Sequence, residues 1–107
     1  MNLPLSQARN NNTSANSILS PAAGEQYYLE KIIVCNTTTG TVTFSIYFDD
    51  DGSTYDQTTA LYYASSLLAN RSQEVPLEFI INNSAGNLAV QNGTANGITF
   101  TLIGEKL

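Results

Sequence analysis

The 107-residue chain contains no histidine and no tryptophan. The lack of histidine excludes the Ser-His-Asp triad, the Cys-His pair and every zinc site that uses an imidazole ligand. A single cysteine, Cys35, excludes a disulfide bond within the chain. Because Cys35 lies in an apolar run, we expect it to be a buried free thiol.

Charged residues are also scarce, at 12% of the chain, and the net charge is −5. The only cations are Arg9, Lys31, Arg71 and Lys106, and they are scattered along the sequence. Four separate cations cannot form the basic patch that neutralises phosphates, so we expect no binding to nucleic acid. The acidic balance would complement a basic patch on a protein partner.

No apolar run is long enough to cross a membrane, and the N-terminus has no apolar segment typical of a signal peptide. We therefore expect a protein that is made in the cytoplasm and has no membrane partner. Hydrophobic residues make up 42% of the chain, which, together with the low charge, argues against disorder. The length has room for one domain.

After residue 25 the chain consists of short apolar runs separated by turn residues, which predicts strands at residues 26–36, 41–48, 60–68, 72–81, 87–91 and 98–103. Val42, Phe44 and Ile46 alternate with polar residues, as in a half-buried strand. Pro76 predicts an edge strand or a bulge. The expected fold is all-β: a single antiparallel β-sandwich or jelly-roll-like barrel of six to eight short strands with an extended N-terminal arm.

The first 25 residues differ from the rest because residues 6–17, SQARNNNTSANS, contain almost no apolar group. This composition predicts a polar arm over residues 1–25, with a possible short strand at 18–19, and a sandwich domain over residues 26–107. Two interpretations of the arm stay open: a disordered tail, or a segment that becomes ordered on a neighbouring subunit. In the second case Arg9, Asn11 and Asn12 are candidate contact residues.

Four aspartates, Asp49, Asp50, Asp51 and Asp56, fall within a predicted loop. Clustered carboxylates can bind calcium, and Asp49, Asp51 and Asp56 are the candidate ligands, although the spacing is not that of an EF-hand. The simpler alternatives are a solvated hairpin loop, or a contact of Asp50 with a basic patch. Nothing in the pattern predicts a pocket that would separate the pKa values of two carboxylates, so we expect no enzyme.

Six tyrosines are many for this length. Tyrosine packs well in strands, but it is also favoured at interfaces, because it combines a large contact area with a polar tip. We expect most of the tyrosines to be packing residues, and Tyr47 and Tyr55 to be candidates for an interface. Tyrosines can also form a platform for carbohydrates.

Four segments together resemble a group of small proteins encoded by tailed phages: IIVCNTT at residues 32–38, VTFSIYF at 42–48, DDGSTY at 50–55 and ALYY at 60–63. In that group an N-T-T strand end leads through a second strand into a D-G-T/S-Y loop, and an A-L-aromatic-aromatic strand follows. The resemblance covers roughly residues 26–103. It implies a virion-associated β-sandwich and brings no catalytic residue with it.

The resemblance implies a capsid decoration protein, which binds the outer shell of a phage and bridges its subunits. The expected partners are the major capsid protein or another virion protein, and further copies of this chain, as a trimer. A tail fibre, neck or adaptor subunit is the alternative within the virion. A calcium-assisted carbohydrate-binding module is the alternative of another class. No cofactor is expected in the first two cases.

Overall fold

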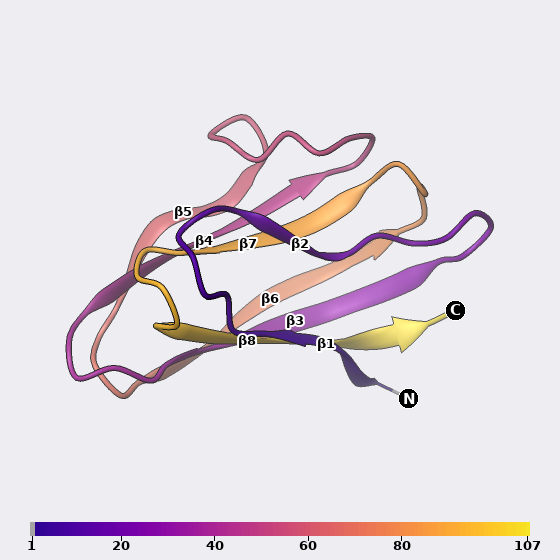
Figure 1. Ribbon diagram of the computed structural model, residues 1–107. Coiled ribbons are helices and arrows are strands. Elements are labelled where there is room, and N and C mark those ends of the chain that lie inside the picture. Colours follow the sequence, from indigo (N-terminus) through magenta and orange to yellow (C-terminus); the bar gives the residue numbers. More distant parts are fainter. Residues whose placement is uncertain (1) are drawn as a thin grey trace.

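The computed structural model describes residues 2–107, and these residues form eight β-strands in two four-stranded sheets (Figure 1). The all-β class is therefore confirmed. The strands are β1 (Leu3–Ala8), β2 (Asn16–Leu19), β3 (Tyr27–Asn36), β4 (Val42–Asp49), β5 (Ala60–Leu67), β6 (Ser72–Ile81), β7 (Asn87–Asn92) and β8 (Ile98–Lys106). No helix that could cross a membrane occurs in this part of the chain.

The strand order is that of a jelly roll. Sheet A has the order β1-β8-β3-β6 and sheet B the order β2-β7-β4-β5. Each strand pairs antiparallel with the strand equally far from the β4–β5 connection: β4 with β5, β3 with β6, β2 with β7 and β1 with β8. The chain is thus one long hairpin rolled on itself, the jelly-roll form of the sandwich that the sequence predicts.

The core lies between the two sheets and follows the alternation of the sequence. Alternate residues of β4 and β8 point inward, and Phe44, Phe100 and Leu102 are almost fully buried there. Each buried side chain of this size stabilises the fold by roughly 1.5–3 kcal/mol. The predicted strands after residue 25 match the observed ones closely, because most of them show this alternation or are short apolar runs bounded by turn residues.

The structure places residues 2–25 within the sandwich, and not on an arm outside it. β1 pairs with β8, and Leu5 packs against the core. β2 contains the predicted strand at 18–19 and pairs with β7. The polar residues 9–15 form the loop that joins them. The predicted boundary after residue 25 does not separate two parts of the fold, because strands on both sides of it share the same two sheets. The sequence concealed this, since main-chain pairing with β7 and β8 can hold a segment that has few apolar side chains.

All four edge strands carry an irregularity. The register shifts within β1, within β2 and opposite β5, where Ala64 has a φ of 48°. On β6, Pro76 lies beside a shift in the pairing with β3, and Glu78 has a φ of 60°. The edge position and the bulge predicted from Pro76 are both confirmed. Such interruptions disfavour the addition of a further strand from another chain.

Cys35 is not in the core. It lies between the buried residues Val34 and Asn36, and alternation therefore turns it to the outer face of sheet A, where it is partly exposed. The expectation of a buried thiol is wrong, because the apolar run around Cys35 contains residues of both faces of β3.

Gly104 provides a test of the close packing of β8 against its two neighbours in sheet A, β3 and β1. A Cβ atom at Gly104 would lie 2.1 Å from the carbonyl oxygen of Tyr28 and 2.9 Å from Cδ1 of Leu5. We expect Gly104→Ala to lower the free energy of unfolding by about 1–3 kcal/mol in urea denaturation, because backbone must shift. The control is Gly40→Ala, which adds a Cβ in open space and should change stability by less than about 1 kcal/mol. Equal stabilities of the two variants would contradict the close packing at Gly104.

Candidate functional site

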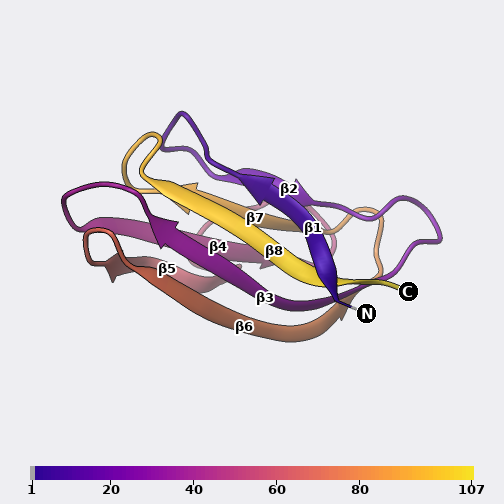
Figure 2. The same cartoon turned by 90° about the horizontal axis from the view of Figure 1, so that it is seen from below.

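The two outer faces of the sandwich differ. Sheet A presents four strands that no loop crosses, as Figure 2 shows. Sheet B is partly covered, because the β4–β5 loop folds back over it at the top of Figure 1. Asn87 of β7 holds this loop by donating from Nδ2 to the carbonyl oxygen of Gly52 at 2.8 Å. The outer face of sheet B is therefore formed by both its strands and the β4–β5 loop that lies over them.

Tyr47 is the centre of this covered face. The residue is 2% exposed, and its ring lies 6.3 Å from the Tyr55 ring and meets the Tyr63 ring nearly edge-on, at 6.5 Å and 75°. Its hydroxyl donates to Oε1 of Gln91. Tyr47 is thus the buried centre of a small aromatic cluster on the outer face of sheet B, together with Tyr55 and Tyr63. It cannot itself contact a partner, which corrects its choice as an interface residue.

Gln91 connects Tyr47 to the β1–β2 loop. Its Nε2 donates to the carbonyl oxygen of Thr13 at 2.9 Å, while its Oε1 accepts from Tyr47. Both ends of the amide are therefore fixed. The loops that reach this face from the two ends of the sandwich, through Thr13 and Tyr55, are held by one short chain of contacts.

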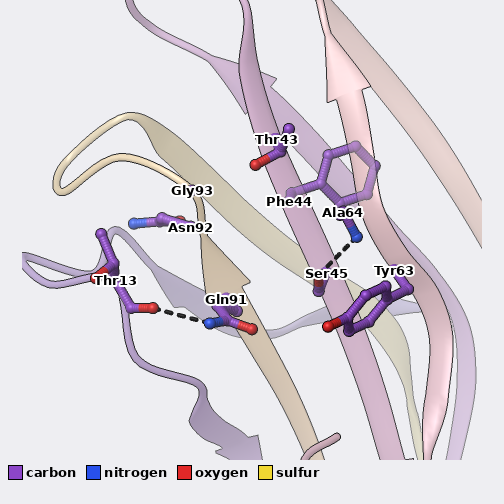
Figure 3. Close-up of a pocket in the computed structure, with 9 residues that line it drawn as sticks. All are labelled: Thr13, Thr43, Phe44, Ser45, Tyr63, Ala64, Gln91, Asn92 and Gly93. Carbon is purple, nitrogen blue, oxygen red and sulfur yellow. Dashed lines mark hydrogen bonds between the residues drawn. The ribbon is translucent and has the colours of Figure 1, made fainter. Parts of the chain in front are cut away.

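A pocket of about 340 Å³ lies beside Gln91, between β4, β5 and β7. Figure 3 shows Ser45 between the side chains of Gln91 and Tyr63, with Thr13 beyond Gln91. Ser45 Oγ accepts the backbone N–H of Ala64 at 2.9 Å, at the bulge of β5. The bulge sets Tyr63 at the rim, where its side chain is 52% exposed. None of the residues that line the pocket is charged.

The acidic loop uses its carboxylates to stabilise its own turns. Asp49 accepts the backbone N–H groups of Thr54, at 2.9 Å, and Asp51, and these bonds lower its pKa. Asp56 accepts the hydroxyl and the N–H of Thr58, which lower its pKa in the same way. Among the described residues, no three acidic, cysteine or histidine side chains are grouped so that they could hold a metal ion. Asp49, Asp51 and Asp56 are thus not brought together as calcium ligands.

The structure divides the remaining predicted contact residues between two places. Arg9, Asn11 and Asn12 lie in the β1–β2 loop, where Arg9 Nε donates to the carbonyl oxygen of Asn96 at 3.0 Å. Asp50 and Tyr55 lie in the β4–β5 loop, at the other end of sheet B (Figure 1). They do not form one patch.

Sequence reasoning did not identify the roles of Gln91, Ser45 and Tyr63. Tyr63 has the same composition signal as the other tyrosines, but its exposure depends on the bulge at Ala64. Gln91 and Ser45 are single polar residues in alternating strands, and nothing in the sequence distinguishes them from solvated positions.

The outer face of sheet A is of mixed character. Tyr28 lies opposite Ile80, and Lys31 lies opposite Ile103 and Pro76, so these side chains share the face. Ile80 is 49% exposed. Three carboxylates, Glu30, Glu74 and Glu78, surround Lys31, whose Nζ binds Glu74 at 2.8 Å. The face combines apolar area with an excess of negative charge.

Comparison of the chain with protein-family models, curated proteins and solved structures found no match.

The hydroxyl of Tyr47 donates one of the two hydrogen bonds that hold the Gln91 amide, so its removal should destabilise the covered face of sheet B. We expect Tyr47→Phe to lower the free energy of unfolding by about 1 kcal/mol, because half-buried Gln91 loses a partner. Urea denaturation measures the change. Tyr63→Phe, at the exposed rim, is the matched control and should change stability by less than about 0.5 kcal/mol. The account fails if the two variants are equally stable.

The turn bonds of Asp49 predict a pH dependence. Because its folded-state pKa lies below the ordinary value of 3.8, the carboxylate stabilises the fold above that pH, and this contribution is lost as the pH falls through the lowered pKa. We expect Asp49→Asn to have a lower melting temperature than the wild type at about pH 6, and the difference to shrink towards about pH 2. Asp50→Asn, at the exposed neighbouring position, is the control. A difference for Asp49→Asn that is independent of pH would contradict this origin.

Proposed function

We propose that the chain is a structural, non-catalytic subunit of a phage virion that binds the outer surface of the capsid shell and stabilises it. The observation that carries the proposal is the outer face of sheet A, which is uncovered by any loop and has apolar residues among carboxylates. The resemblance of residues 26–103 to small phage virion proteins points to the same class.

The face of sheet A suits a docking surface on physical grounds. Ile80, which is about half exposed, and Ile103 place apolar area on this face, and burial of such area is the main driving force for association. The excess of carboxylates around Lys31 complements a basic patch on a partner. All four sheet edges are interrupted, which favours association through a face over the addition of strands.

A subunit that binds only the assembled shell stabilises it by mass action, since the bound state gains free energy that the dissociated capsid proteins do not. Self-association, as a trimer, is part of the proposal. The exposed loops are its candidate contacts: Arg9, Asn11 and Asn12 on the β1–β2 loop, and Asp50 and Tyr55 on the β4–β5 loop.

Co-sedimentation with purified capsids assembled from the major capsid protein of the same phage tests the proposal. We expect the wild type to sediment with the shells and Ile80→Lys to lose binding by about tenfold or more, because a charge replaces apolar contact area. Leu61→Lys, on the exposed part of β5, is the matched control and should bind like the wild type.

Cys35 reports independently on which face is covered, because it is the only thiol and lies on the outer face of sheet A. We expect maleimide to react with Cys35 more slowly on shells than in solution. In a Cys35→Ser, Ser66→Cys variant, the thiol lies on β5 of sheet B and should react equally fast in both. Absence of sedimentation would overturn the proposal, and binding to purified tails in place of shells would support the tail subunit instead.

A further inference from the structure

The pocket on the outer face of sheet B lies away from the face that we propose for docking. It opens between β4, β5 and β7 and is bounded by Thr13, Thr43, Ser45, Tyr63 and Gln91 (Figure 3). These residues offer hydroxyl groups, one amide and one aromatic ring, without any charge. Its volume of about 340 Å³ is at the lower end of the range for small-molecule sites, roughly 300–1,000 Å³.

The chemistry of the lining selects a class of ligand. A phosphate or carboxylate group would need a cation, and none lines the pocket. A purely apolar ligand would cover the O–H donors of Ser45 and Thr43 and offer them no acceptor. A ligand that has many hydroxyl groups and an apolar ring face fits both the polar and the aromatic part of the lining. Its hydroxyl groups exchange hydrogen bonds with the polar side chains, and its ring face packs on Tyr63.

The walls are also fixed before any ligand arrives. Gln91 is held at both ends of its amide by Tyr47 and Thr13, so it needs no rearrangement. Tyr63 is braced edge-on against Tyr47 and keeps 52% of its surface exposed. Its position depends on Ala64, whose φ of 48° is an unfavourable conformation for a residue other than glycine. A rigid site loses little conformational entropy on binding.

We propose that this pocket binds a neutral sugar of an oligosaccharide, with Tyr63 as the stacking ring and with Thr43, Ser45 and Gln91 as hydrogen-bonding partners. The site differs from the calcium-assisted carbohydrate module considered from the sequence, because it lies outside the acidic loop and uses no metal. On a particle docked through sheet A, sheet B would face outward, where such a site would meet glycans of a surface. The sugar site does not depend on that docking.

The test is a titration of the isotope-labelled protein, followed by amide chemical shifts. The probes are neutral oligosaccharides of glucose, galactose, mannose and N-acetylglucosamine, preselected on a glycan array. We expect shifts at Ser45, Ala64 and Gln91, unchanged by EDTA. Tyr63→Ala should weaken binding about tenfold or more, and Tyr63→Phe by a few-fold at most, because the ring is kept. Leu61→Ala, also exposed on β5 but outside the pocket, should bind like the wild type.

Three results would overturn the proposal: no binding of any neutral glycan at millimolar concentration, binding that EDTA abolishes, or binding that Tyr63→Ala leaves unchanged. Urea denaturation of each variant separates loss of the site from loss of the fold. If Tyr63→Ala does not fold, Thr43→Arg fills the same pocket from an exposed position on β4 and should abolish binding. Capsid binding is unaffected by any of these results, so the two proposals fail independently.

Discussion

Nested strand pairing is the constraint on which the rest of this structure depends. Because β4 pairs with β5, β3 with β6, β2 with β7 and β1 with β8, each pair encloses the pair before it along the chain, and the two terminal strands lie side by side. The rolled hairpin then closes over a core made of the inward residues of both sheets, among them Phe44 and Phe100. Its tip, the β4–β5 loop, has no strand left to pair with and folds back over sheet B through Asn87 and Tyr55.

This arrangement gives the molecule two dissimilar outer faces. On sheet B, Tyr47 and Gln91 hold the loops from opposite ends and leave a neutral, aromatic pocket beside Tyr63. On sheet A nothing crosses the strands, and apolar side chains such as Ile80 lie among carboxylates. The interrupted edges direct contacts to these faces and to the loops. A structural subunit that docks through one face and presents the other is the function that we propose for this division.

The sequence predicts the fold well where side chains alternate and poorly where the backbone alone decides. Val42 to Phe48 and Ile98 to Leu102 show the period of two, and their strands lie where this pattern predicts them. β1 (LPLSQA) has no regular alternation and runs into the polar residues that follow it, so the residue pattern does not show its pairing with β8. The outer face of sheet B escaped prediction for another reason: alternation assigns Tyr47 to solvent, and only the return of the loop buries it. The same limit applies to the pocket, because Ser45, Tyr63 and Gln91 come from three strands.

The central claim, that the protein is a virion subunit with sheet A against the shell and sheet B outward, is tested most directly by electron cryomicroscopy of the intact particle. The account predicts density for the sandwich at many equivalent sites on the capsid, with β1, β8, β3 and β6 facing the shell and Tyr63 facing solvent. Density in which sheet B faces the shell, or a particle without this protein on its capsid, would contradict it.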